Sequence, residues 1–139
     1  MAKQTGLAWT TLTVEDADGS TARDIRNDVT NVGWGMPRGA QEVTGIDKSA
    51  YERLLLLADF SIEINGVCNF GAVPSATSHG VFATVPSTSV QRTTVLGIGG
   101  KSLTNQVLYT DYAINRTENG ELTFKAPGVL ADGTVPTWA

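Results

Sequence analysis

The sequence contains a single cysteine and a single histidine among its 139 residues, and it has no long hydrophobic run. Cys68 cannot form a disulfide within the chain, and a lone thiol is typical of proteins from a reducing compartment. One cysteine and one histidine do not make a zinc site of the usual kind, so we expect no metal and no cofactor. The longest apolar run, residues 54–58, is much shorter than a membrane-spanning helix, and residues 1–6 lack the apolar core of a signal peptide. We therefore expect synthesis in a cytoplasm and no membrane partner.

Basic residues are also few. Lys and Arg total 10 against 14 Asp and Glu, which gives a net charge of −4, and they form no cluster in the sequence. A surface that binds nucleic acid needs clustered cations, so specific binding to DNA or RNA is not expected. A composition of 41% hydrophobic and 17% charged residues fits one globular domain over residues 1–139. The abundance of Thr, Val, Gly and Ser favours strands and turns.

The pattern along the chain predicts several strands. The segments 8–14 and 21–25 read as a hairpin joined by the turn residues 16–19, in which Gly19 is able to take a positive φ. Phe60, Ile62 and Ile64 alternate with polar residues, as in a strand with one buried face. Residues 29–34 are expected to form a third strand or to continue the second past a bend. A further strand is expected at 88–98, ending at a Gly99-Gly100 turn. Residues 66–78 resemble a loop, and the pattern of 79–85 fits either a short helix or a strand.

A helix is predicted over residues 48–58. Ser49 and Glu52 fit the capping box, with Asp47 as a rival cap, and the apolar residues that follow recur at helical spacing. The preceding segment, residues 33–45, has four glycines, one proline and no apolar periodicity, so we expect a long loop. Two interpretations of this loop remain open: a mobile surface loop, or a loop that becomes ordered against another subunit.

The last hairpin allows a prediction of register. A two-residue turn at Asn119-Gly120 would place Ile114 opposite Lys125, so that the apolar pairs fall on opposite faces of the sheet. A three-residue loop, 118–120, instead pairs Ile114 with Phe124. Because a slip of one residue moves every side chain to the other face, burial selects the three-residue loop, with Gly120 left-handed.

No motif in the chain predicts catalysis. His79 has no Gly-x-Ser-x-Gly elbow and is interpreted as a polar surface residue. Gly100-Lys101-Ser102 matches the end of a Walker A loop, but the required first glycine is Val95, so a Gly-Gly turn is the better interpretation. Residues 15–19 are acidic but lack the spacing of a calcium-binding loop. We therefore expect no enzyme and no catalytic residue.

The succession of segments resembles the tail tube proteins of long, non-contractile bacteriophage tails. The segments that carry the resemblance are Val-Thr-Gly-Ile-Asp at 43–47, Asp-Phe-Ser-Ile-Glu-Ile-Asn-Gly-Val at 59–67, Gly-Glu-Leu-Thr-Phe at 120–124 and Val-Leu-Ala-Asp-Gly at 129–133. The order of elements fits from about residue 6 to residue 138. The sequence departs from the pattern at Cys68-Asn69, where an aromatic residue is expected before the asparagine.

This resemblance implies a mainly β fold: an antiparallel β-sandwich or partly closed barrel, with the helix at 48–58 flanking it and the loop at 33–45 reaching the adjacent ring. It implies hexameric rings that stack head to tail into a hollow tube, through which DNA passes into the host without specific binding. Its other partners would be the tape measure, tail terminator and distal tail proteins, and its location the phage tail of the virion. The contacts between subunits and between rings are expected at Trp34, Met36, Arg38, Gln41, Glu42 and Trp138. Because the net charge is negative, we also expect an acidic lumen that repels DNA.

Two other functions remain open. One is another virion part of related fold, such as a tail terminator or a capsid decoration protein, which would not form a filament. The other is a small glycan-binding β-sandwich, for which Trp9, Trp34 and Trp138 would form an exposed aromatic patch, although core or interface positions suit these residues better.

Overall fold

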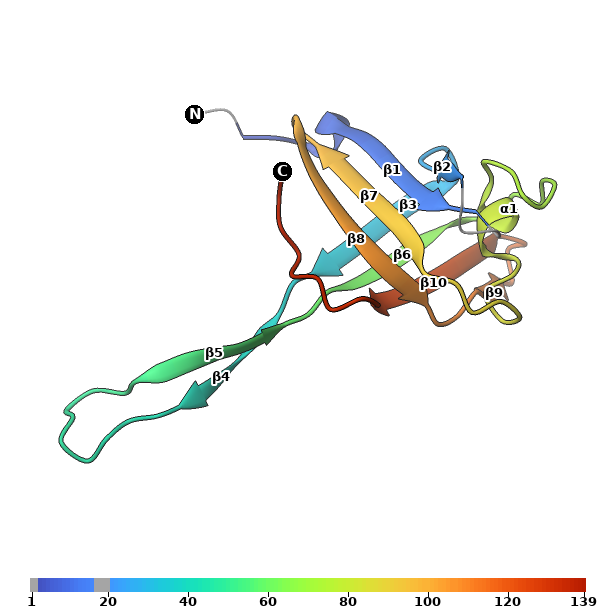
Figure 1. Ribbon diagram of the computed structural model, residues 1–139. Helices are drawn as coiled ribbons and strands as arrows, with labels where there is room; N and C mark the ends of the chain where they lie inside the picture. The colour runs from blue at the N-terminus through green and yellow to red at the C-terminus, as the bar shows by residue number, and fades with distance from the viewer. Residues whose placement is uncertain (1–2, 17–20) are drawn as a thin grey trace.

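The computed structural model describes residues 3–16 and 21–139, and within them the fold is mainly β. The sequence-based expectation of a mainly β fold with one α-helix is confirmed, although the helix lies elsewhere in the chain (Figure 1). The elements in order are η1 (Gly6–Ala8), β1 (Trp9–Glu15), β2 (Ala22–Asp24), β3 (Val29–Gly35), β4 (Arg38–Glu42), β5 (Arg53–Ala58), β6 (Ser61–Val67), α1 (Ser78–Phe82), β7 (Arg92–Ile98), β8 (Lys101–Tyr109), β9 (Ala113–Arg116) and β10 (Leu122–Leu130).

Eight of these strands form one antiparallel sheet that folds over on itself. The order is β2-β1-β7-β8-β10-β6-β3, and β9 pairs with β10 beside this path. The pairing between β8 and β10 covers only residues 107–109 and 128–130, so the sheet bends sharply there into two layers. Strands β1, β7 and β8 form one layer and β10, β6 and β3 the other (Figure 1). The result is a sandwich whose sheet does not close, since β3 and β1 are not paired with each other.

The core lies between the two layers and follows the alternation of the strands. Residues at every second position of β6, β8 and β10 are buried, as their side chains point inward. The predicted burial of Phe60, Ile62 and Ile64 is confirmed. The buried hydrophobic residues are Leu12, Val14, Ile25, Phe60, Ile62, Ile64, Val81, Phe82, Leu96, Leu103, Val107, Tyr109, Phe124 and Ala126.

Helix α1 plugs one end of the sandwich. Its N-cap Thr77 accepts a hydrogen bond from the Gly80 amide, and Val81 and Phe82 are fully buried. The buried guanidinium of Arg92 donates to the carbonyl of Val81, to the carbonyl of Glu15 at 3.2 Å and to Thr84 Oγ1 at 3.0 Å. Burial lowers the pKa of the Arg92 guanidinium, whereas its electrostatic interactions with Tyr109, Asp16 and Glu15 act to raise that pKa. The sequence pattern of residues 79–85 fitted either a short helix or a strand. The structure shows that this segment begins as helix α1, and that Arg92 connects the helix to β1.

The predicted helix at 48–58 is wrong. Residues Arg53–Ala58 are strand β5, which pairs with Arg38–Glu42, strand β4. A capping box would need the Glu52 amide to bond to Ser49, but that amide donates to Thr44 Oγ1 at 2.9 Å. Local helix propensity is overridden because β4 supplies cross-strand partners, with Glu42 opposite Arg53, Gln41 opposite Leu54, Ala40 opposite Leu55 and Arg38 opposite Ala58. The predicted loop at 33–45 is wrong for the same reason, since most of it belongs to β3 and β4.

Two turn predictions are confirmed. Ile114 pairs with Phe124 and Arg116 with Leu122, the Thr117 amide donates to the Glu121 carbonyl, and Gly120 has a φ of +89°. Ile98 pairs with Lys101 across the Gly99-Gly100 turn, where both glycines have positive φ. The predicted pairing of the first two strands also holds, as Thr13 lies opposite Asp24. The predicted conformation of Gly19 lies outside the described residues.

Candidate assembly surfaces

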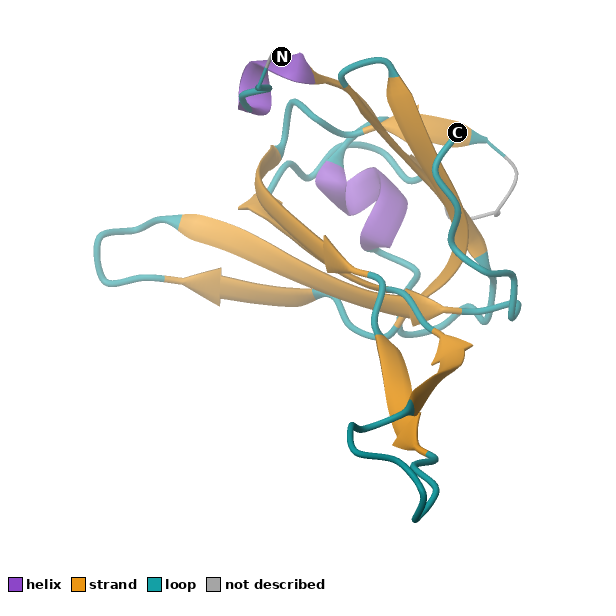
Figure 2. Ribbon diagram, turned by 90° about the vertical axis from the view of Figure 1, so that its left-hand side faces the viewer, coloured by secondary structure: helices purple, strands orange, loops and turns teal. Residues whose placement is uncertain are grey.

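The β4–β5 hairpin is an arm that projects away from the sandwich. We define the arm as residues 38–58; β3 leads into it and β6 leads out of it (Figure 1). Figure 2 shows the arm from its tip side, with no other element packed along its strands. At its base the Asp59 amide donates to the Pro37 carbonyl at 3.0 Å. A two-stranded ribbon on its own is marginally stable in water, so such an arm requires a partner surface to become rigid.

Both faces of the arm are apolar and exposed. Leu54 is 58% exposed, Leu55 64%, Leu56 45% and Leu57 91%. Leu54 and Leu55 are successive residues and point to opposite faces, whereas the register against β4 shifts between Leu55 and Ala58 and interrupts the alternation there. Cross-strand neighbours of the leucines, Ala40 opposite Leu55 and Gln41 opposite Leu54, do not cover them. Exposed apolar surface of this kind marks an interaction site, and here two surfaces are needed to cover it.

Four of the six residues expected at subunit contacts belong to the arm or its base. Arg38, Gln41 and Glu42 are exposed on β4, and Met36, 37% exposed, lies just before it. The Arg38 guanidinium donates to the Leu56 carbonyl at 2.9 Å, which fixes it across the ribbon. Glu42 lies opposite Arg53 in the register.

The other two expected residues meet at the open side of the sandwich. Trp34 of β3 packs edge-on against Trp9 of β1, with centroids 5.3 Å apart, and Trp138 lies 6.4 Å from Trp34. Trp138 forms a bridge to Leu103, and the next residue exchanges two backbone hydrogen bonds with Ser102. Trp138 is therefore held by its own chain while 43% of it remains exposed.

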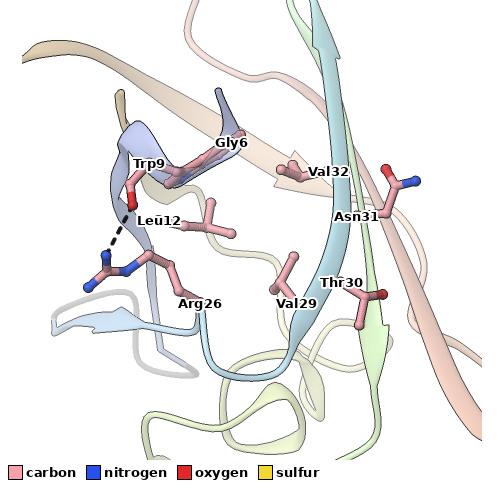
Figure 3. Close-up of a pocket in the computed structure, with 8 residues that line it drawn as sticks. All are labelled: Gly6, Trp9, Leu12, Arg26, Val29, Thr30, Asn31 and Val32. Carbon is pink, nitrogen blue, oxygen red and sulfur yellow. Dashed lines mark hydrogen bonds between the residues drawn. The ribbon is translucent and has the colours of Figure 1, made fainter. Parts of the chain in front are cut away.

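A groove of about 600 Å³ runs between β1 and β3 beside these tryptophans (Figure 3). A bulge after Val29 breaks the alternation of β3, so Val29 and Val32 both point toward β1. The Arg26 side chain also lines the groove, and its guanidinium donates to the Trp9 carbonyl at 3.3 Å on the β1 side (Figure 3). Among the described strands, β3 pairs only with β6, so its other edge is open at this groove. An open sheet edge is a site at which another chain adds a strand.

The end of the sandwich opposite the arm carries a second apolar surface. We define the end patch as Phe70, Ile114 and Leu122, which are 56%, 45% and 38% exposed. The Cys68 amide donates to the Leu122 carbonyl, Ile114 lies opposite Phe124 in the register, and Cys68 and Tyr112 are half-buried against the core. Neither the arm ribbon nor the end patch was found from the sequence. The run of four leucines that follows the polar segment 38–42 is the one signal that could have indicated the ribbon, but it was interpreted as part of a helix.

The chemistry at this end does not suit catalysis. His79 stacks on Phe70 at 4.8 Å and its Nδ1 lies 3.4 Å from the Tyr112 hydroxyl, which places the ring against aromatic groups. Burial raises the pKa of the Cys68 thiol, and burial together with Cys68 raises the pKa of Tyr112 to about 12. Both groups are therefore protonated near neutrality and poor nucleophiles. In residues 3–16 and 21–139, no group of acidic, His and Cys side chains is arranged to hold a metal.

None of the helices in the described part of the chain has the length and apolar character needed to cross a membrane.

The fold is that of an antiparallel β-sandwich with a long projecting hairpin, and solved structures share it. One is a chain of the virion of a native gene transfer agent particle, with a TM-score of 0.72 and 14% identity, matched over 97% of this chain and 99% of that chain. Another is a chain from the tail of an empty gene transfer agent particle with C6 symmetry, with a TM-score of 0.72 and 17% identity, matched over 99% and 98%. No protein-family profile and no curated protein sequence matches the chain. At these identities the likeness establishes a common fold.

Proposed function

We propose that this protein is a structural subunit of a phage-like tail, forming hexameric rings that stack head to tail into a hollow tube for DNA delivery. The observation that carries the proposal is the arm, a two-stranded ribbon with exposed leucines on both faces. Such a ribbon gains its stability from burial between neighbouring copies. The shared fold with a chain of a C6-symmetric tail supports the ring number.

The arm replaces the loop at 33–45 as the connector between subunits. Its exposed Arg38, Gln41 and Glu42 suit the rim of such a contact, where polar groups surround an apolar centre. Contacts between stacked rings are heterologous and do not close on themselves, so they generate a filament. The open edge of β3 suits pairing within a ring, because a strand from the neighbour removes an edge that would otherwise aggregate.

In this function the chain has no catalytic role, and its place is the virion. The tape measure, tail terminator and distal tail proteins would be its further partners. A ring carries six times the net charge of −4, and lumenal acidic groups would keep DNA from adhering. Lumen-facing residues that are mostly Lys and Arg would refute this acidic-lumen hypothesis.

The experiment is to purify the protein and examine it by negative-stain electron microscopy beside size-exclusion chromatography. Rings and tubes are expected. A chain with Leu54 and Leu56 replaced by Ser is the matched control, since it keeps the sandwich and changes only the arm. A single ring that never stacks would instead indicate a terminator-like part. A protein that stays monomeric at every salt and concentration, even with an added assembly nucleus, would refute the proposal.

A further inference from the structure

We propose that Asn119 is a site of spontaneous covalent modification, at which the side-chain amide is converted to aspartate and isoaspartate without an enzyme. The proposal is independent of the proposed tail function. The sequence contains the dipeptide Asn-Gly at 65–66 and again at 119–120, and the fold places the two copies in different settings. The first copy lies within strand β6 and the second lies in the loop between β9 and β10. This difference in setting predicts that only the second copy reacts in the folded protein.

The reaction requires only the chain and water. The Gly120 amide nitrogen loses its proton and attacks Cγ of Asn119, which closes a succinimide ring and releases the side-chain nitrogen as ammonia. Water then adds to either ring carbonyl and the C–N bond of that carbonyl breaks, which gives aspartate or isoaspartate. Glycine favours the ring closure because it has no Cβ to hinder the approach of its nitrogen.

Asn119 lies where this reaction is accessible. Its side chain is exposed and, within the described part of the chain, makes no hydrogen bond. The Gly120 amide is held by a turn hydrogen bond to the Thr117 carbonyl at 3.0 Å. The loop 118–120 lies beyond the last paired residues of β9 and β10, so this bond opens locally without breaking the sheet. The nitrogen and the side-chain amide are then both free to react.

Asn65 is the same dipeptide in a closed setting. It pairs with β10 on one side and with β3 on the other, and its side-chain nitrogen donates to Glu63 Oε1 at 3.2 Å. Gly66 is buried, and a Cβ added to it would overlap the Asp28 carbonyl oxygen. Ring closure needs a backbone rotation that this enclosure prevents. The reaction at Asn65 therefore requires the opening of a strand in the centre of its layer, which is among the rarest openings of a folded domain.

The modification changes both the charge and the length of the turn. Either product replaces a neutral amide with a carboxylate, so each chain gains one negative charge at neutral pH. In isoaspartate the backbone runs through the former side chain and gains a methylene group. The loop 118–120 sets the pairing of Arg116 with Leu122, so the longer backbone is expected to disturb this end of the hairpin.

The test follows the folded chain during incubation at mildly alkaline pH, with samples digested briefly by trypsin and analysed by mass spectrometry. Digestion separates the two sites, because Asn119 falls in the peptide 117–125 and Asn65 in the peptide 54–92. Replacement of NH2 by OH raises the peptide mass, and chromatography separates the isoaspartyl from the aspartyl form. Asn119 is expected to react at least about tenfold faster than Asn65, since the strand opens far more rarely than the loop.

Two controls separate the effect of the fold from that of the dipeptide. In guanidinium chloride both dipeptides are exposed, and Asn119 and Asn65 are expected to react at similar rates. The variant Gly120→Ala adds a Cβ beside the attacking nitrogen and is expected to slow the reaction at Asn119 severalfold, with circular dichroism used to verify the fold. Gly6→Ala, with open space around the added Cβ, is expected to leave both rates unchanged.

Each outcome supports or overturns the proposal without reference to tube formation. A native Asn119 that stays intact as long as native Asn65 overturns it, and so does a rate at Asn119 that Gly120→Ala leaves unchanged. Fast and equal loss at both native sites overturns the protection by β6. A rate at Asn119 that rises with pH supports the attack by the deprotonated Gly120 amide. If Gly120→Ala does not fold, the comparison of the two native sites decides alone.

Discussion

Trp34 packs edge-on against Trp9, with ring centroids 5.3 Å apart and planes at 89°. The two residues lie on β3 and β1, strands of opposite layers that share no backbone hydrogen bonds. The aromatic contact therefore joins the layers on the side where the sheet does not close. Trp138 adds a third ring from the end of the chain, which is tied to β8.

Replacing Trp34 with Ala is expected to destabilise the isolated domain by about 2 kcal/mol, less than for a fully buried tryptophan because Trp34 is half-buried. Urea unfolding followed by circular dichroism measures the change. Trp138→Ala serves as the control and is expected to cost less, since its ring is 43% exposed. Equal costs for the two variants would contradict the central role of Trp34 in the cluster.

Arg92→Met is expected to lower the free energy of unfolding by about 3 kcal/mol, because it leaves the buried carbonyl of Val81 and the part-buried carbonyl of Glu15 without their donor. Denaturant unfolding measures it. Lys101→Met, an exposed site on β8, is expected to change stability by no more than about 0.5 kcal/mol. If Arg92→Met proves as stable as the unaltered chain, the bridge from α1 to β1 contributes little.

Each of the two faces of the arm is expected to be required for tube formation. Leu54→Ser alters one face, and Leu55→Ser at the next position alters the other, since both residues lie where β5 pairs with β4 in unbroken register. Each substitution is expected to abolish tubes in electron micrographs, while the free energy of unfolding of the monomer changes by no more than about 1 kcal/mol because these side chains are exposed. Tubes that survive either substitution would mean that only one face is covered in the assembly.

Gly120→Ala is expected to cost about 1 kcal/mol, since Gly120 has a φ of +89° and an L side chain is strained there. Thermal or urea unfolding measures the loss. Gly6 has no atom within 4 Å of an added Cβ and no positive φ, so Gly6→Ala is the matched control with little expected effect. A smaller loss for Gly120→Ala than for Gly6→Ala would speak against the three-residue loop.

The pKa of Tyr112, raised to about 12, predicts alkaline instability. Because the folded-state pKa lies above the ordinary value of 10.0, the stability contribution is complete below pH 10 and is lost as the pH rises toward 12. Tyr112→Phe is expected to reduce the loss of stability over this range. Urea unfolding at several alkaline pH values, with phenolate absorbance recorded in parallel, measures it; identical pH profiles for the two proteins would refute the assignment.

The local pattern of apolar and polar residues was sufficient to predict much of the sandwich. Phe60, Ile62 and Ile64 alternate with polar residues, and this period alone predicts which face of β6 is buried. The register of β9 and β10 followed from the same rule, since only one loop length places Ile114 and Phe124 on one face. Gly99-Gly100 and Gly120 predicted turns because glycine adopts positive φ without strain.

The arm shows where local pattern failed. Leu54 to Leu57 satisfy helical spacing as well as strand pairing, and a run of four leucines has no period of its own. The choice depended on β4, a polar strand of no obvious pattern that lies alongside and takes up the backbone hydrogen bonds of β5. Propensity is a weak prior that tertiary pairing overrides.

The sequence by itself determined the strands with one buried face, the tight turns and the scarcity of catalytic groups, because these depend on residues near one another in the chain. Only the tertiary structure decided that residues 38–58 form a projecting ribbon and that Trp9, Trp34 and Trp138 meet. It also decided that the apolar surfaces lie at opposite ends. These features arise from pairing and packing between distant segments, which spacing along the chain does not encode.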